Sequence, residues 1–442
     1  MHQIISYREI GKLAFPVTIA QATVLLGGLI DLAFIGPFGT EAIAAVSIAN
    51  ALCATLFNFL DGFRLATTVL IAKAAAAGNW PKATAVVNSG LFLAAVIGLM
   101  LAAFAPNISN TVYALAGSGP MKYYGADYLT VWLWTTPLIL FSYVLIGLFR
   151  GLGDTATPLY STVAVCLLNV LFDYLFVFGG LGFPSVGVKG AAWGTGLANL
   201  AGLVFIGCLV LKKRLTNRCV NLRQPFFRHI PEYISLAAAV GLNTGFTLLA
   251  LLLFVWLIKP LGSTALAVHQ ITLQVFNFAY LPAVGFLITA SIIVPRLIAK
   301  RQQGLLVPTA VRICQTSFGV ILVTSGLLFV FSATVGRFFS PVDHLVAEQA
   351  AQTIRLVCLG QLFSSVYLVL RGVLTGCQDT RFIVFEGLIS GYLIFLPLAY
   401  WLAIQSGYGI WGGYLAFLIW CVTDCLALAF RFFRQKRWLR LA

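Results

Sequence analysis

Long apolar stretches, separated by short polar segments, recur along the whole chain. Each contains about 20 apolar residues, the length that a helix needs to cross roughly 30 Å of hydrocarbon. No regular alternation of the strand type accompanies them, so the backbone has to satisfy its hydrogen bonds within helices. The pattern therefore predicts an all-α polytopic membrane protein with twelve transmembrane helices. The predicted spans are 14–36, 44–72, 84–105, 124–149, 156–179, 188–211, 234–258, 265–294, 308–334, 346–370, 382–404 and 409–430.

The composition supports membrane insertion and excludes several other classes. Of 442 residues, 60% are hydrophobic and 9% are charged, whereas an average soluble domain has about 25% charged residues. The nine cysteines form no CxxC pair and no Cys/His spacing, so we expect neither a metal site nor a disulfide framework. The chain has no HExxH motif and no ordered Ser/His/Asp set, which argues against an enzyme and against a cofactor.

Basic residues gather on one side of the predicted membrane. An even number of spans puts both termini on one side, and 22 of the 28 Lys and Arg residues fall there. The positive-inside rule then places both termini in the cytoplasm. The net charge of +15 is thus a topology signal, and no nucleic-acid recognition motif accompanies it. Arg64 and Arg355 fall within spans, and the other side holds Lys122, Lys189, Lys259 and Arg337.

The two halves of the chain echo each other at nearly constant spacing. The shifts between paired segments are 223, 225 and 222 residues, so a single duplication accounts for all three. The pairs are PFGTEAIAAV (37–46) with PLGSTALAVH (260–269), GLFRGLGDT (147–155) with GVLTGCQDT (372–380), and GVKG (187–190) with GIWG (409–412).

This duplication predicts two pseudo-symmetric lobes of six helices in the same orientation around a central cleft. Such repeats are typical of secondary transporters, whose lobes rock between inward-open and outward-open shapes. The predicted domains are an N-terminal lobe (1–211), a basic cytoplasmic linker (212–233), and a C-terminal lobe with a basic tail (234–442).

Two carboxylates lie deep within predicted spans, Asp31 and Asp173. A charged side chain there costs on the order of 2.5–3.5 kcal/mol, so such residues usually face a bundle interior or a wet cavity. Asn169 precedes Asp173 by one helical turn, which places the two side chains on one helix face. An Asn side chain donates to an ionised Asp or accepts from a protonated one. Thr195 and Asn199 repeat the spacing of four on the sixth span.

The second half does not repeat this polar cluster. Its corresponding segment, YLIFLPLAYWL (392–402), has no carboxylate. We therefore expect a titratable pocket in the N-terminal lobe that its duplicate lacks. Other charges in the spans are candidate ion pairs or gating residues, namely Asp61 with Arg64, three residues apart, and Arg355 with Asp424. A role in packing alone stays open for these residues.

Several motifs resemble the multidrug and toxic compound extrusion (MATE) family over nearly the whole chain. A further motif, FRLATT (63–68), is more similar to the DinF-like prokaryotic branch of that family. The family motifs are LIDLAFIGPFGTEAIAAVSIA (29–49), AKAAAAGN (72–79), RGLGDTATPL (150–159), LNVLFDYLFVFG (168–179), GVKGAAWGTGLAN (187–199) and LGSTALAVHQI (261–271).

The resemblance implies a monomeric antiporter of the inner membrane, which exports amphipathic organic cations in exchange for inward H⁺ by alternating access. Na⁺ is the other candidate ion, because two carboxylates, an Asn and a Thr supply hard oxygen ligands. Bending of the first span at Pro16 is a further implication. A lipid or oligosaccharide flippase of the same wider architecture is the alternative, which a wide basic cavity would favour. In DinF-like relatives the coupling cation binds in the N-terminal lobe, and the matching positions here are Asp31, Asn169, Asp173, Thr195 and Asn199.

Overall fold

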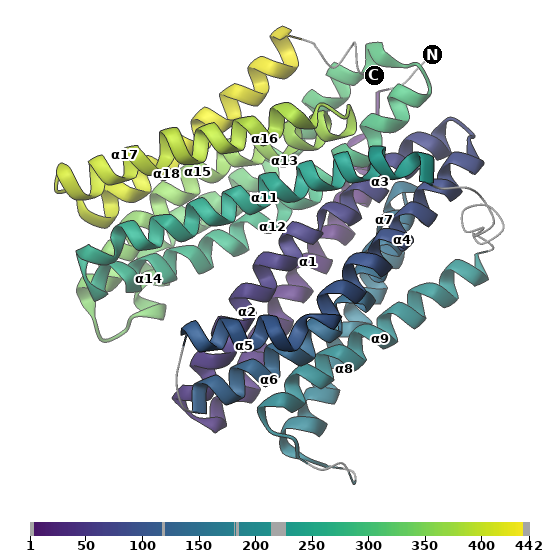
Figure 1. Cartoon of the computed structure of the whole chain (residues 1–442). Coiled ribbons are helices and arrows are strands. Elements are labelled where there is room, and N and C mark those ends of the chain that lie inside the picture. The colour runs from purple at the N-terminus through teal and green to yellow at the C-terminus, as the bar shows by residue number, and fades with distance from the viewer. Residues whose placement is uncertain (1–3, 117–119, 181, 183–184, 214–226, 436–442) are drawn as a thin grey trace. The chain divides into compact units, whose positions relative to one another are not determined.

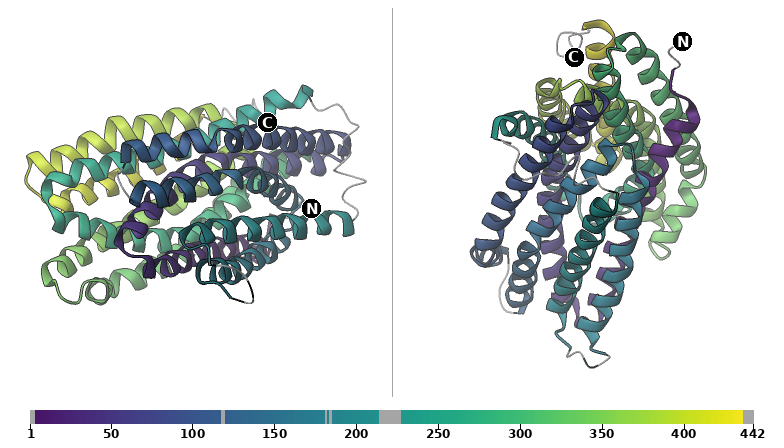
Figure 2. Two further views of the ribbon diagram at one scale, coloured as in Figure 1. Left: turned by 60° about the horizontal axis from the view of Figure 1, so that its bottom comes forward. Right: turned by 90° about the vertical axis from the view of Figure 1, so that its right-hand side faces the viewer.

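The computed structural model describes residues 4–116, 120–180, 182, 185–213 and 227–435 (Figure 1). Most of the predicted basic linker, 214–226, and the end of the predicted basic tail, 436–442, lie outside the described residues. The described chain is helical almost throughout, as the additional views in Figure 2 show. The predicted all-α fold is therefore confirmed.

The described part of the first half consists of α-helices, with one 3-10 turn, η1, between α1 and α2. They are α1 (Tyr7–Ile35), η1 (Gly36–Phe38), α2 (Thr40–Leu60), α3 (Gly62–Ala76), α4 (Trp80–Ala103), α5 (Ala105–Ala116), α6 (Pro120–Trp134), α7 (Thr136–Gly151), α8 (Ala156–Phe178) and α9 (Val188–Lys212).

The second half contains 3-10 turns (η2, η3, η4) and π-helical stretches (η5, η6, η7) beside its α-helices. The elements are η2 (Phe227–His229), α11 (Ile230–Ile258), η3 (Lys259–Leu261), α12 (Ser263–Ala299), η4 (Gln303–Leu305), α13 (Leu306–Val330), α14 (Ser332–Phe339), α15 (His344–Gly376), α16 (Thr380–Ile389), η5 (Ser390–Phe395), α17 (Leu396–Tyr400), η6 (Trp401–Gln405), α18 (Gly409–Phe430) and η7 (Arg431–Gln435).

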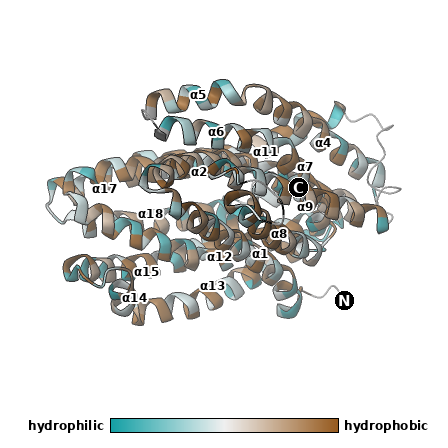
Figure 3. Ribbon diagram, turned by 90° about the horizontal axis from the view of Figure 1, so that it is seen from below, coloured by the Kyte–Doolittle hydropathy of each residue, from teal (hydrophilic) through white to brown (hydrophobic). Residues whose placement is uncertain are grey.

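The described helices match the predicted number of spans. Eleven are long and apolar enough to cross a membrane, and a bent pair, Lys122–Trp134 with Thr136–Gly151, supplies a twelfth. The pair bends by 42°, just before Pro137 near the start of α7. Proline lacks the N–H that would continue the helical ladder, which explains the break. Apolar residues, coloured brown, recur along the helices in Figure 3, as membrane-spanning segments require.

The chain divides into two compact units. The N-terminal unit contains Ile19–Ala238, and the C-terminal unit contains Met1–Thr18 with Ala239–Ala442. Within the N-terminal unit α3 packs on α7, and α8 packs along α9; within the C-terminal unit α12 packs along α15, and α15 along α18. The division into lobes at 1–211 and 234–442 stays a prediction.

Glycine pairs at equivalent places in the two halves explain one of the sequence echoes. A Cβ on Gly147 or Gly151 of α7 would lie 2.6–2.7 Å from atoms of α3. A Cβ on Gly372 of α15 would lie 2.3 Å from the Leu287 carbonyl oxygen on α12, and one on Gly376 would lie 3.0 Å from Pro295. Only glycine permits helix backbones to approach this closely, as at small-residue interfaces in membranes.

A second echo has a backbone cause. Gly39 and Gly262 have φ angles of 91° and 94°, and each directly precedes a long helix, α2 or α12. Glycine adopts this region without the steric cost that a Cβ brings. The repeated Pro-x-Gly of the two segments therefore encodes the same turn in each unit.

Small residues on one face of α9 let this helix pack closely against α8. A Cβ on Gly190 would lie 2.4 Å from the Phe176 carbonyl oxygen, and one on Gly202 would lie 2.2 Å from Val165. Gly194 and Ala198 lie between these two glycines, so a small residue occupies every fourth position. This spacing of four is the small-xxx-small pattern of close membrane helix pairs, and it positions the polar residues of α8 and α9.

Candidate cation-binding site

The N-terminal unit brings two carboxyl groups together from different helices. Asp31 lies on α1 and Asp173 on α8. The Asp173 side chain is fully buried, and Asp31 is half-buried. Their carboxyl groups lie within hydrogen-bonding reach of each other. When both groups are ionised, two negative charges therefore lie close together inside the N-terminal unit.

Most carboxyl oxygens of Asp31 and Asp173 receive no hydrogen bond from the described residues. Both oxygens of Asp173, and Oδ1 of Asp31, are buried without a partner in the described part of the chain. Two ionised carboxylates only accept hydrogen bonds, so neither can satisfy the other. A proton held between them turns one into a donor, and a small bound cation would accept oxygens of both as ligands and offset part of their charge. The geometry is therefore suited to binding H⁺ or a small cation.

Asn169 and Thr195 connect this pair to α9. The Asn169 amide lies beside Asp173, but its Nδ2 donates to Thr195 Oγ1 at 3.1 Å. Thr195 Oγ1 in turn donates to the Ala191 carbonyl oxygen of its own helix at 3.0 Å. This chain of donors leaves the Asn169 amide oxygen available as a ligand. Asp31, Asn169, Asp173 and Thr195 thus form one group.

Asn199 lies one turn beyond that group. Its Nδ2 donates to the Thr195 carbonyl oxygen at 2.8 Å, which is a bond within α9. The contact ties Asn199 to the backbone beneath Thr195 and not to either carboxylate. Asn199 thus bonds to its own helix and to none of the other four predicted side chains.

Sequence reasoning missed the residues that shape this group. A Cβ at Gly194 would lie 2.1 Å from Asp173 Oδ1, so the glycine leaves the space that the carboxylate fills. Tyr128 of α6 is buried within electrostatic range of both carboxyls, and its hydroxyl donates to Asn50 Oδ1 at 3.1 Å. The small-residue spacing on α9 could have revealed Gly194, whereas no local pattern singles out Tyr128.

The predicted pair Asp61 and Arg64 forms an ion pair, with 2.5 Å between Arg64 Nη2 and Asp61 Oδ1. Asp61 lies between α2 and α3, and Arg64 lies in the first turn of α3. The Arg64 guanidinium also lies over the Tyr143 ring, 5.1 Å from its centre. The pair thus holds the junction of the two helices, and a gating role for it stays a prediction.

The structure does not pair Arg355 with Asp424. Arg355 is exposed, and its Nε donates to Ser332 Oγ at 2.9 Å. Asp424 is buried on α18, where its neighbours are Glu386 of α16 and Arg371 of α15. The separation arises because Arg355 and Arg371 lie far apart along α15, at places with different surroundings.

Buried carboxyls in the C-terminal unit correct the expectation of a single polar cluster. The expectation rested on the segment 392–402, which aligns with Asp173 of the first half. Glu386 and Asp424 lie outside that segment, so a comparison of aligned positions could not find them.

Pro16 lies inside α1, which is one continuous helix from Tyr7 to Ile35.

Comparison with known proteins decides the family. The MatE family model matches residues 16–175 and again 239–401. The chain belongs to the MatE family. Its members, the MATE proteins, are transporters and not enzymes. The two matches begin 223 residues apart, the same shift that separates the first pair of sequence echoes.

Curated MATE relatives resemble the chain over nearly its full length. The probable multidrug resistance protein NorM of Thermotoga maritima is 26% identical over 449 residues, which cover 98% of this chain and 94% of the relative. Multidrug resistance protein MdtK of Edwardsiella ictaluri is 25% identical over 447 residues, covering 98% and 95%.

Solved MATE structures share the fold. The outward-facing conformation of a multidrug resistance MATE family transporter superposes with a TM-score of 0.90 at 19% identity, covering 98% of this chain and 96% of that one. A MOP superfamily transporter from Pyrococcus furiosus superposes with a TM-score of 0.87 at 18% identity, with the same coverage. The multi-pass helical architecture of MATE transporters is thus shown for this chain.

Proposed function

We propose that this protein is a multidrug efflux antiporter, which exports small amphipathic organic cations in exchange for inward H⁺. The observation that supports the coupling step is the pair of Asp31 and Asp173, three of whose four carboxyl oxygens are buried without a hydrogen-bond donor from the described residues. The relatives named as multidrug resistance proteins support the substrate class. Na⁺ is the second candidate ion.

The coupling site of this proposal consists of Asp31, Asn169, Asp173 and Thr195. With the pair ionised, the N-terminal unit carries buried negative charge that favours a cationic substrate. A proton bound between the two carboxyls neutralises part of that charge and favours release of the substrate. Exchange follows because cation and substrate prefer different states of the protein; a ligand indifferent to both states would drive nothing.

Asn199 and Pro16 have supporting roles in this proposal. Asn199 holds the α9 backbone at Thr195 and so orients the Thr195 hydroxyl. Pro16 removes one backbone hydrogen bond of α1, the helix that carries Asp31. Bending of α1 at this point, when the pair takes up a proton, would move Asp31 with it.

The proposed location is the inner membrane, with both termini in the cytoplasm and the protein acting as a monomer. The excess of Lys and Arg on the side of the termini supports this orientation. The DinF-like branch is proposed on the motif FRLATT and on the acidic pair in the N-terminal unit. The acidic pair favours drug export over lipid or oligosaccharide transfer, for which a basic cavity is expected.

Asp173→Asn tests the coupling site. We expect loss of cation efflux from proteoliposomes under an imposed pH gradient, with membrane insertion unchanged, because an amide cannot bind and release the proton. Asp127→Asn is the matched control, since Asp127 of the same unit pairs with Lys189 at 2.6 Å and should retain efflux.

Imposing pH and sodium gradients separately identifies the ion. Efflux driven by the pH gradient alone supports H⁺, and efflux driven by sodium alone assigns Na⁺ in its place. Full efflux by Asp173→Asn under either gradient would overturn the coupling site itself.

A further inference from the structure

A second carboxyl pair is buried in the C-terminal unit. Glu386 lies on α16 and Asp424 on α18, with exposed fractions of only 6% and 7%. Their carboxyl groups lie within hydrogen-bonding reach of each other. The pair belongs to helices that have no part in the site formed by α1, α8 and α9.

Most oxygens of this pair have no donor. Both oxygens of Glu386, and Oδ1 of Asp424, are buried without a hydrogen-bond partner in the described part of the chain. Orphaned oxygens of this kind are rare in proteins and call for a bound proton, ion or water. Since two ionised carboxylates cannot donate to each other, one bound proton is the simplest way to join them.

Arg371 of α15 is the nearby cation, but it does not neutralise the pair by contact. Its Nη2 donates to Thr244 Oγ1 of α11 at 2.9 Å, and it forms no ion pair within 4 Å with either carboxylate in the described structure. With both acids ionised the group of three carries one net negative charge. A single bound proton makes it neutral.

The other titratable groups that face the pair are weak acids. Tyr367 comes from α15, Tyr280 from α12, and Cys421 and Cys425 from α18. From α11 the described neighbours are Thr244 and Thr247, which do not titrate. Arg371 is thus the only cation that the described elements place beside the pair.

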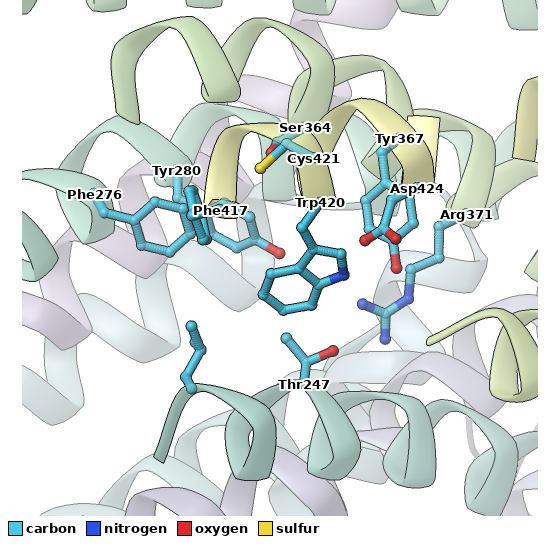
Figure 4. A pocket seen from close by; sticks show the side chains of 11 residues that line it. Thr247, Phe276, Tyr280, Ser364, Tyr367, Arg371, Phe417, Trp420, Cys421 and Asp424 are labelled. Carbon is cyan, nitrogen blue, oxygen red and sulfur yellow. The ribbon is translucent and has the colours of Figure 1, made fainter. Parts of the chain in front are cut away.

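A pocket adjoins the pair on the side of Asp424. Its volume of about 70 Å³ has room for a few water molecules but not for a drug-sized ligand. Asp424 and Arg371 line it together with rings that include Trp420 and Phe417 (Figure 4). Water in this pocket would lie against Asp424, whereas a drug-sized ligand would not fit.

The helix beside the pair is also irregular. Ser390, one turn after Glu386, begins the π-helical stretch η5, and its hydroxyl accepts a hydrogen bond from Trp420 Nε1 at 3.1 Å. Single π-helical turns within α-helices occur frequently at functional sites. This irregularity lies where the carboxyls of α16 and α18 meet.

We propose that Glu386 and Asp424 form a second proton-binding site, separate from the site proposed in the N-terminal unit. The bound proton lies between one Glu386 oxygen and one Asp424 oxygen as O–H···O⁻, and it leaves to water in the adjoining pocket. Each structural unit then carries its own exchangeable proton. The site does not depend on the coupling role of Asp31 and Asp173.

A metal cation fits this site less well than a proton. Hard cations bind several oxygen ligands, whereas this pair offers two carboxyl groups beside a fixed positive charge, Arg371. The Arg371 guanidinium offers only donors and repels a cation. Binding of Na⁺ with displacement of the proton would therefore overturn the proposal.

Infrared difference spectroscopy between low and high pH tests this site directly. The experiment uses the full chain carrying Asp31→Asn and Asp173→Asn, so that the N-terminal pair does not contribute. We expect a protonated-carboxyl C=O band that disappears as pH rises, and that is absent when Glu386→Gln and Asp424→Asn are added. Glu348→Gln, an exposed carboxyl of the same unit, should leave the band unchanged.

Isotope labelling provides a test that needs no change at the pair. Glutamate labelled with ¹³C at the side-chain carboxyl should shift part of the band, since Glu386 shares the proton. The proposal would be overturned if the band persists in the Glu386→Gln, Asp424→Asn protein. It would also be overturned if the label does not shift the band, or if the band vanishes when Na⁺ is added at constant pH. Efflux by the Asp173→Asn protein is measured separately, so failure of either proposal is recognisable.

Discussion

At the scale of single residues, a glycine leaves the space that the buried Asp173 carboxylate occupies. The Cα of Gly194 faces that carboxylate, and an added Cβ would lie 2.1 Å from Oδ1 and 2.8 Å from the Asp173 backbone N. Real Cβ contacts of that length do not occur, so either the carboxylate or α9 would have to move. Part of the site is therefore specified by the absence of a side chain.

Gly194→Ala should both destabilise the protein and impair proton-coupled efflux. Overpacking of a well-packed interior typically costs about 1–3 kcal/mol, and the displaced carboxylate would separate from Asp31. The thermal unfolding midpoint and efflux under a pH gradient measure these effects. Gly207→Ala is the matched control on the same helix, because its added Cβ meets nothing within 4 Å. Equal behaviour of the two variants would contradict the steric argument.

At the scale of helices, each unit ties one loop to the end of its last span. Asp154, in the loop before α8, pairs with Lys213 just after α9. Asp379, in the loop before α16, pairs with Arg431 just after α18 through bonds of 2.8 and 3.0 Å. The two aspartates are equivalent in the repeat, but only the second pair is bidentate and buried.

The two pairs should differ strongly in their contribution to stability. Removing one partner of a buried pair costs about 3–5 kcal/mol, which we expect for Arg431→Ala because it leaves Asp379 buried without its cation. The side chains of Lys213 and Asp154 have exposed fractions of 44% and 28%. Because solvent screens such a pair, we expect Lys213→Ala to lower the free energy of unfolding by only about 0–1 kcal/mol. Thermal unfolding in detergent measures both. A larger effect for Lys213→Ala would show that burial does not decide the difference.

The Asp154 pair should also weaken in acid. Burial alone would raise the pKa of the Asp154 carboxyl, but hydrogen bonds from Lys213 and Thr157 outweigh it and lower that pKa below 3.8. A lowered folded-state pKa gives stability that is complete above the unfolded pKa and is lost as pH falls through the folded pKa. The gap in melting temperature between wild type and Asp154→Asn should therefore close on acidification below about pH 4. A gap that widens in acid would contradict this sign.

At the scale of the whole molecule, charge asymmetry and span number together predict the topology. Eleven or twelve spans fit the described helices, depending on whether the bent pair of α6 and α7 crosses once. With twelve, both termini lie on the side that carries 22 of the 28 basic residues. The proposed orientation, with both termini in the cytoplasm, would place the loop of Asp154 and the loop of Asp379 there as well.

Reporter fusions test that orientation. Green fluorescent protein fused after Ala442 should fluoresce, and alkaline phosphatase at the same place should be inactive, because only the phosphatase needs export to fold. A phosphatase fusion within residues 259–263, between α11 and α12, should be active. The reverse pattern would refute the cytoplasmic placement of the termini.

The spans, the family and the repeat follow from the sequence alone, because they depend on local properties. Hydrophobic length specifies a span whatever its neighbours are, and the glycines at 39 and 262 mark the same turn in both halves. Sequence spacing also placed Asn169 beside Asp173, since both lie on one helix. These features need no knowledge of which helices touch.

Only the tertiary structure decided which polar groups meet. Asp31 of α1 and Asp173 of α8 are far apart in the sequence, and only the folded unit places their carboxyl groups side by side. Asn199 instead bonds to the backbone of its own helix. The pair of Glu386 and Asp424 escaped sequence reasoning because it does not occupy the positions that repeat the first half. Contacts between helices depend on the shapes of their packed faces, which hydrophobic periodicity within one helix does not encode.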